Sequence, residues 1–538
     1  MRSLVLHGTR RLRRLVSSGS AGLAVGFVIA VVGAACGAEG ADGIGTGGGT
    51  SASSSSSGTG GGGGAPPEQE IESSFGAPVA TGKYVWIANP TSGRVAYIDA
   101  TTLAVKLVDA GYGPTYVAAV PDPADDVAVV LNVLSHDATI LRASSSGISA
   151  VSVPVPAAGN AWAISPDGHW AIAWTDARRV KSPDPVEGYQ DISVIDLTKG
   201  AEIATDLTIG FRPVAVAFES TGKRAFAVTQ DGISVMDLAG SAPAVVKNIA
   251  LGDTPSEPAT TRDVAITPDG HVALVRREGK AVIDVFSLDD GSRTAVTLPA
   301  PATDIDLSAD GTTAVAVVRE TSQVGLLPVP GVITDPLSAG FVTVDATIGS
   351  ASLASASPIA FFYTNATPSP VLAVMDTAAS PPSPRTILTR APILGVFATA
   401  DAAHAVVLHD QLDDAGSHYP AAVTFAPIAL DLPPKIVGLD APPISVAVAP
   451  QGDHALVAAG DETSKIHQLV IGSMPSLKVR KIALASMPIA AGIVAGAGRG
   501  YVAQKHPDGR ITFVTLETGE ARTITGFELA TQVVDGAP

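Results

Sequence analysis

Cysteine is almost absent from this sequence, because Cys36 is the only one among 538 residues. A single cysteine excludes an internal disulfide and paired-thiol or iron–sulfur chemistry within one chain. Aromatic residues make up only 5% and charged residues 16% of the chain, whereas glycine (55) and proline (40) are abundant. This composition predicts an all-β protein, in which many short strands are joined by turns, rather than long amphipathic helices.

Basic residues are also scarce, since 34 lysines and arginines accompany 51 acids and leave a formal net charge of −17. An acidic surface repels nucleic acids and anionic lipid headgroups. We therefore expect no nucleic-acid partner, and no attachment to a membrane except through a lipid anchor.

Common catalytic signatures are missing too. The sequence has no H-E-x-x-H motif, no G-x-S-x-G motif after the N-terminal signal and no phosphate-binding loop. Residues 220–225, "STGKRA", contain Gly222-Lys223 without the hydroxyl residue and upstream glycine of such a loop. We expect no cofactor, and a non-catalytic protein is favoured over an enzyme.

Residues 1–35 have the pattern of an export signal. Five arginines precede an apolar stretch at residues 21–32, namely Arg2, Arg10, Arg11, Arg13 and Arg14. The segment "VGAAC" at 32–36 resembles a bacterial lipobox, with Gly33 where that motif usually has a larger aliphatic residue. The resemblance implies a lipid on Cys36, and ordinary signal cleavage before Cys36 is the alternative. Because Gly37 follows Cys36, the resemblance also implies that the protein is located at the outer membrane or the cell surface. The alternatives are location in the periplasm or secretion.

Residues 36–67 are nearly all glycine, serine, alanine and threonine. Such a segment cannot bury a core, so we expect a disordered tether. The remaining residues, 68–538, form the expected folded domain.

A short turn pattern recurs through that domain, as in "ITPDGHVALV" at 266–275. The turn residues of the repeats are Gly82, Ala124, Gly168, Gly222, Gly270, Gly311, Ala403, Gly452 and Gly498. Their spacing, with a degenerate member near 355–377, predicts ten repeats of about 46 residues.

Each repeat contains four short apolar segments. Residues 443–484 read "PISVAVAP", "HALVAAG", "KIHQLVI" and "VRKIAL", separated by turn residues. Four strands per repeat of 40–50 residues is the signature of a β-propeller blade, a four-stranded antiparallel sheet that must stack on its neighbours. We expect one closed ring, with two smaller propellers as the alternative.

Two repeats carry a family resemblance. Residues 83–120, "KYVWIANPTSGRVAYIDATTLAVKLVDAGYGPTYVAAV", and 191–218, "DISVIDLTKGAEIATDLTIGFRPVAVAF", resemble the YVTN repeat of WD40-like bacterial propellers. The resemblance implies the fold. It does not fix the function, because propellers host many activities.

Antiparallel strands send alternate connections to opposite faces of the ring. The tight Pro-Asp-Gly turns share one face, which we interpret as structural. Insertions at 175–191, 252–263 and 410–420 fall on the other face and mark it as the candidate binding surface. The candidate ligand-binding residues there are Arg178, Arg179, Lys181, Tyr189 and Tyr419.

Histidines and acids gather at residues 404–418. Their spacing matches no known ligand set, and His404 lies at or next to the repeat position of His169, His271 and His454, so we expect no metal site. Asp196, Asp237 and Asp284 recur at the end of predicted third strands, so we likewise interpret them as turn residues.

The leading hypothesis is therefore a lipid-anchored propeller that binds a protein, peptide or glycan at the cell envelope without transforming it. The alternatives are a periplasmic propeller enzyme, of the lactonase or quinoprotein oxidoreductase kind, and a structural envelope protein. A polar site with shifted pKa values would favour the enzyme, and an exposed apolar patch would favour binding.

Overall fold

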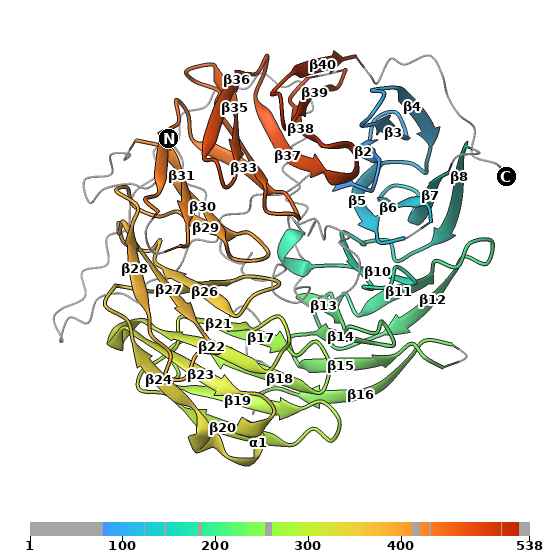
Figure 1. Cartoon of the computed structure of the whole chain (residues 1–538). Helices are drawn as coiled ribbons and strands as arrows, with labels where there is room; N and C mark the ends of the chain where they lie inside the picture. The colour runs from blue at the N-terminus through green and yellow to red at the C-terminus, as the bar shows by residue number, and fades with distance from the viewer. Residues whose placement is uncertain are drawn as a thin grey trace, which may run out of the picture.

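Ten small antiparallel sheets account for nearly all regular structure in this protein (Figure 1). The computed structural model describes residues 79–526 except 123, 145–146, 181–185, 241, 253–260, 411–419, 430–431 and 507. The predicted signal peptide, Cys36 and the tether lie outside the described residues. The prediction of four-stranded blades, ten in number, is confirmed.

The first five blades span residues 79–297. Blade 1 contains β1 (Val79–Ala80), β2 (Tyr84–Asn89), β3 (Arg94–Asp99) and β4 (Val105–Asp109). Blade 2 contains β5 (Pro114–Val120), β6 (Asp126–Asn132), β7 (Asp137–Ser144) and β8 (Gly147–Pro154). Blade 3 contains β9 (Ala161–Ile164), β10 (Trp170–Trp174), β11 (Asp191–Asp196) and β12 (Ile203–Thr208). Blade 4 contains β13 (Ala215–Phe218), β14 (Arg224–Val228), β15 (Gly232–Asp237) and β16 (Ala244–Ala250). Blade 5 contains β17 (Arg262–Ile266), β18 (Val272–Arg277), β19 (Val282–Ser287) and β20 (Arg293–Thr297).

The other five blades span residues 304–525. Blade 6 contains β21 (Asp304–Leu307), β22 (Thr313–Val318), β23 (Gln323–Pro328) and β24 (Gly340–Thr343). Blade 7 contains β25 (Ser350–Leu353), β26 (Ile359–Tyr363), β27 (Val371–Asp376) and β28 (Arg385–Leu388). Blade 8 contains β29 (Gly395–Ala398), β30 (His404–His409), β31 (Ala422–Pro427) and β32 (Lys435–Gly438). Blade 9 contains β33 (Pro443–Val448), β34 (His454–Asp461), β35 (Ile466–Ser473) and β36 (Lys478–Ala483). Blade 10 contains β37 (Pro488–Val494), β38 (Arg499–Gln504), β39 (Arg510–Thr515) and β40 (Ala521–Thr525).

Helical structure in the described residues is limited to single turns within connections. These are η1 (Ala177–Arg179), η3 (Arg319–Thr321), α1 (Gly331–Thr334), η4 (Pro336–Ser338) and η5 (Ala495–Ala497). No helix in this part of the chain has the length and apolar character needed to cross a membrane.

The position of a strand within its blade explains its sequence pattern. The second strand of blade 5, β18, reads VALVRR and is buried at five consecutive residues, because neighbouring blades cover both faces of its sheet. The outermost strand of blade 4, β16, reads AVVKNIA and alternates between exposed and partly buried residues. The apolar runs of the sequence are thus second and third strands, and the alternating segments are edges.

The core is divided among the contacts between blades. Ten apolar clusters occupy the described residues, and each cluster joins one pair of adjacent blades. One of them unites Val85 and Ile98 of blade 1 with Tyr501 and Phe513 of blade 10. The prediction of one closed ring is therefore confirmed, and the alternative of two smaller propellers is wrong.

The closing contact between blades 10 and 1 is a face-to-face packing of sheets. A Cβ atom on Gly496 would lie 2.7 Å from the carbonyl oxygen of Gly82, so the two blades meet closely at this point. The sequence also suggests a last strand at 527–534 that completes blade 1, but that segment lies outside the described residues. Blade 1 has its own innermost strand in β1, which pairs Val79 and Ala80 with Trp86 and Val85.

Candidate functional site

The ring has two faces with different construction. The turn face carries the first-to-second and third-to-fourth strand connections of each blade. The loop face carries the second-to-third connections and the connections from one blade to the next. As predicted, the long connections 175–190, 251–261 and 410–421 begin and end at the loop face, although 181–185, 253–260 and 411–419 lie outside the described residues. The connection between β23 and β24, at 329–339, lies on the turn face.

The turn face is stabilised by one repeated hydrogen-bonded turn. In blade 5, the Thr267 hydroxyl donates to Asp269 Oδ1, and the amides of His271 and Val272 donate to Asp269 Oδ1 and Thr267 Oγ1, both at 3.0 Å. The same hydroxyl-to-carboxylate bond, 2.5–2.7 Å long, occurs in four blades, at Ser165–Asp167, Thr267–Asp269, Ser308–Asp310 and Thr399–Asp401. The Ser308 and Thr399 hydroxyls are the main reason that the pKa values of Asp310 and Asp401 are lowered. Repetition of a fully bonded turn indicates a structural role.

The interpretation of Asp284 as a turn residue is wrong. Asp196 and Asp237 do end third strands, but Asp284 lies inside β19 and is only 2% exposed. It forms ion pairs with Arg277 and Arg293. Asp284 is therefore a buried ion-pair residue, because its place in the strand directs its side chain toward the arginines of β18 and β20.

The blade 3 insertion, residues 175–190, begins with a compact polar anchor. Asp176 is 1% exposed and accepts hydrogen bonds from the Arg178 amide at 3.0 Å and from Arg178 Nε and Nη2 at 2.8 Å each. Arg178 Nη2 also donates to the carbonyl oxygen of Val214 in the connection to blade 4. The guanidinium fork of Arg178 is thus directed at Asp176.

Arg179 lies beside the same carboxylate. Its Nε is 3.5 Å from Asp176 Oδ2, and burial lowers its pKa, with the charge of Asp176 acting in the opposite direction. The structure therefore brings Arg178 and Arg179 together around one acid.

The far end of the insertion is also attached to the ring. The Arg212 amide donates to the carbonyl oxygen of Gly188 at 2.7 Å, and Arg212 Nε donates to that of Glu187 at 3.2 Å. Tyr189, which is half-buried, adopts a φ of +47° next to this contact. Lys181 and Tyr419 lie outside the described residues, so the structure does not join them to the other candidates.

The loop face also has a pair of exposed apolar residues that is not among the candidates predicted from the sequence. Tyr112, between blades 1 and 2, is 76% exposed, and Leu134, in the β6–β7 connection, is 71% exposed. The Leu134 amide donates to the Tyr112 carbonyl oxygen at 3.0 Å, and the Tyr112 amide donates to Ser135 Oγ at 2.9 Å. We call Tyr112 and Leu134 the apolar knob.

Side-chain hydrogen bonds hold the backbone of the apolar knob in place. Asn132 Nδ2 donates to Asp137 Oδ1 at 2.6 Å, and the Ser135 hydroxyl donates to the same oxygen at 3.0 Å. One sequence pattern could have pointed to Tyr112. The segment "GYGP" at 111–114 is similar to "GFRP" at 210–213, so that Phe211 has the same place in its repeat as Tyr112. Side chains held by a rigid scaffold lose little entropy on binding, which suits the knob to recognition.

Groups with shifted pKa values are spread over several blades of the ring. Burial lowers the pKa of His409 in blade 8 and raises that of Tyr501 in blade 10. Hydrogen bonds from Ser292 lower the pKa of Asp290 in blade 5 to about 2. Among the described residues, no three His, Cys, Asp or Glu side chains are placed to hold a metal ion.

No protein-family model and no curated protein matches this chain. Among solved structures it is similar to the "eukaryotic initiation factor" (13% identity, TM-score 0.45, covering 80% of this chain and 96% of that one). It is also similar to "dihydro-heme d1 dehydrogenase NirN in complex with DHE" (12% identity, TM-score 0.42, covering 78% and 76%). A third similar structure is the β-propeller domain of Myceliophteria thermophila Cps50 (15% identity, TM-score 0.31, covering 57% and 94%). These likenesses concern the architecture alone, so the YVTN resemblance stays a prediction.

Proposed function

We propose that this protein is a non-catalytic binding module of the cell envelope, whose loop face docks a protein, peptide or glycan. A lipid on Cys36 and the tether at 36–67 would hold the propeller at the outer membrane or cell surface. The observation that supports binding most directly is the apolar knob. Exposed tyrosine next to an aliphatic residue on a fixed backbone is the kind of anchor that carries much of the energy of recognition.

Other features of the loop face agree with this proposal. Three further large apolar side chains are exposed there, namely Val186 (85%), Ile466 (37%) and Ile489 (58%). The Arg178–Asp176–Arg179 cluster carries a net positive charge on an acidic protein, which would favour a partner with acidic or polar groups near its apolar contact. The proposed ligand-binding residues of the loop face remain Arg178, Arg179, Lys181, Tyr189 and Tyr419.

A photo-cross-linking amino acid tests this proposal in the full-length protein. It would replace Tyr112 in one strain and Leu337 in a second strain. Leu337 is a matched control because it is 91% exposed but lies on the turn face. We expect light-dependent adducts in the envelope fraction from position 112 and few from position 337.

Purified protein provides the quantitative arm of the same test. The partner from the adduct, or a glycan array where no protein adduct forms, would be tested against the wild type and the Tyr112→Ala/Leu134→Ala double variant. We expect the double variant to bind at least about tenfold more weakly, since two exposed anchors are lost, and to keep its thermal midpoint. If the double variant binds as tightly as the wild type, or if positions 112 and 337 give equal amounts of adduct, the proposal that the loop face binds the partner is wrong.

A further inference from the structure

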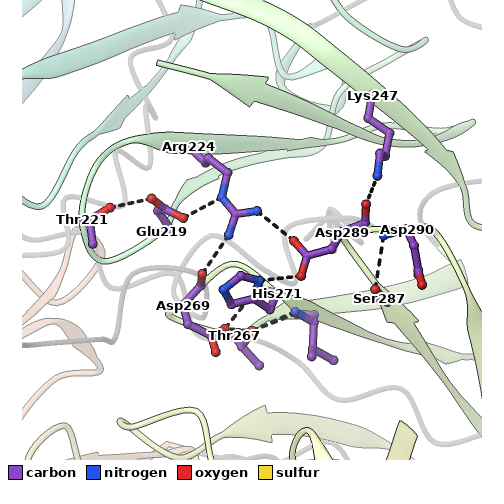
Figure 2. A network of polar contacts seen from close by, with 11 residues as sticks. Glu219, Thr221, Arg224, Lys247, Thr267, Asp269, His271, Ser287, Asp289 and Asp290 are labelled. Carbon is purple, nitrogen blue, oxygen red and sulfur yellow. Dashed lines mark hydrogen bonds and ion pairs between the residues drawn. The ribbon is translucent and has the colours of Figure 1, made fainter. Parts of the chain in front are cut away.

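An arginine joins blades 4 and 5 on the turn face. Arg224, the first residue of β14, donates from Nε to Glu219 Oε2 at 2.7 Å and from Nη1 to Asp289 Oδ1 at 3.2 Å (Figure 2). Its Nη2 donates to the carbonyl oxygen of Asp269 at 3.0 Å. Burial alone would lower the pKa of Arg224, but the two carboxylates outweigh it and raise the pKa above its usual value.

Blade 10 has an arginine at the same place. Arg499 is the first residue of β38, and it pairs with Thr515 at the end of β39 as Arg224 pairs with Asp237 at the end of β15. Two residues further on, Tyr501 packs on the next blade around the ring, as Phe226 does. Arg499 therefore faces blade 1 as Arg224 faces blade 5.

The two acids that hold Arg224 have no counterparts around Arg499. Glu219 directly follows β13, whereas the residue that directly follows β37 is Ala495. Asp289 is the second residue after β19, whereas the second residue after β3 is Thr101. In the part of the chain that the structure describes, no acid forms an ion pair with Arg499.

A small hollow lies beside Arg499 at the turn-face end of blade 10. It has a volume of about 80 Å³, is open to solvent, and is lined by Arg499, Phe513, Thr515, Glu520 and Arg522. Glu520 accepts hydrogen bonds from Arg522 Nε and Nη2, at 3.2 and 3.1 Å, so these two opposite charges lie together. The hollow keeps one uncompensated positive charge, on Arg499.

We propose that this hollow binds the carboxylate group of a small organic acid. The ligand carboxylate would take the place that the carboxylates of Glu219 and Asp289 have around Arg224. A guanidinium offers two parallel N–H donors that match a carboxylate, and the Thr515 hydroxyl lies on the same wall to donate a third bond. A ligand that binds only the folded protein also raises its thermal midpoint.

Ligand-observed NMR on the full-length protein tests the proposal with three defined probes. Acetate and succinate would be titrated at constant ionic strength, and inorganic phosphate would be titrated as a separate arm. We expect both carboxylates to bind the wild type and to raise its thermal midpoint with concentration. No binding of either carboxylate, or tighter binding of phosphate than of both, overturns the assignment.

Variants locate the site. Arg499→Ala should weaken carboxylate binding by at least about tenfold because two charge-assisted hydrogen bonds are lost, and Arg499→Lys should restore it only in part. Arg94→Ala is the matched control, because Arg94 pairs with Asp109 on the loop face of blade 1. Carboxylate binding that survives Arg499→Ala, or that falls equally with Arg94→Ala, contradicts the proposal.

A complementary variant supplies the missing acid. Thr101→Asp places a carboxylate at the position that Asp289 has in blade 5, and Thr101 is exposed, so folding should not suffer. We expect this variant to lose carboxylate binding by at least about tenfold and to unfold at a higher temperature than the unliganded wild type. Binding that matches the wild type would show that Arg499 is not the recognition group.

Discussion

Asn160 and Asp176 form a closed pair of hydrogen bonds at the root of the blade 3 insertion. The Asn160 side chain accepts from the Asp176 amide at 2.7 Å and donates to the Asp176 carbonyl oxygen at 3.1 Å. Both residues are buried, so an unmatched group here costs about 1–3 kcal/mol. In a domain of this size we expect Asn160→Ala to lower the thermal midpoint by about 2 °C.

The control for this prediction is Asn160→Asp, which keeps the shape and the acceptor but loses the donor. It should be at least as destabilising as the alanine variant, because a buried carboxylate would then face the Asp176 carbonyl oxygen. Differential scanning calorimetry would measure both. A midpoint equal to that of the wild type in either variant would show that the insertion is an accessory loop.

The repeated turn of the turn face gives a second prediction. In Thr267→Ala the hydroxyl that bonds Asp269 and the Val272 amide is lost, so we expect the free energy of unfolding to fall by about 1–2 kcal/mol. Thr267→Ser retains the hydroxyl and should stay close to the wild type. If both variants lose the same stability, the methyl group rather than the hydrogen bonds is responsible.

Blade 9 offers the reverse experiment, because its turn has Ala449 and Gln451 where blade 5 has Thr267 and Asp269. The double variant Ala449→Ser/Gln451→Asp would install the hydroxyl and the carboxylate together. We expect its thermal midpoint to rise by about 1 °C, and each single variant to change it less. A lower midpoint in the double variant would indicate that this turn cannot adopt the geometry of the other four.

Most of the fold could be predicted from the sequence because a propeller is a repeat protein. Four short apolar segments recur in every blade and the turn pattern recurs in most of them, so an ambiguous repeat can be interpreted from its neighbours. Strands β33 (Pro443–Val448) to β36 (Lys478–Ala483) begin and end within a few residues of those segments. Closure into a single ring depends on the packing of blade 1 against blade 10, where Val85 and Tyr501 share one apolar cluster. No local sequence pattern contains this long-range contact.

The candidate site was less predictable, because exposure and ion pairing depend on neighbouring blades. Loop length correctly placed the blade 3 insertion on the loop face. It could not show that Arg178 would be directed at Asp176, or that a short connection would expose Tyr112 beside Leu134. Arg499 could not be identified as a candidate from the sequence, because its unusual feature is the absence of the acids that accompany Arg224.

Because His409 is buried, we expect the folded protein to lose stability in mild acid. It is fully buried, with Nδ1 2.9 Å from the Pro392 carbonyl oxygen and Nε2 2.7 Å from the Thr424 hydroxyl. Burial lowers its pKa despite the bond to Pro392, whereas an unfolded histidine has a pKa of about 6.5. Between the two values only the unfolded chain binds the proton, so stability falls as the pH decreases below about 6.5.

Thermal unfolding at pH 7.5 and pH 5.5 would measure this effect. The midpoint of His409→Gln should be lower at pH 7.5 but should change less between the two pH values than that of the wild type. His136, which is exposed in the β6–β7 connection, provides the control, and His136→Gln should keep the pH dependence of the wild type. Equal pH dependence in His409→Gln would mean that other groups cause the acid sensitivity.

Anchoring at Cys36 is the last prediction, and it concerns where the propeller acts. If Cys36 carries lipid, the thioether-linked group and the acylated amino terminus together supply several hydrocarbon chains, enough for stable attachment where one chain would be marginal. Cys36→Ser should then move the protein from the membrane fraction to the soluble fraction without changing its thermal midpoint. A Ser57→Ala variant in the tether serves as the control and should remain with the membrane. If Cys36→Ser also remains with the membrane, a lipid on Cys36 does not anchor the protein, and the propeller is held there by another contact.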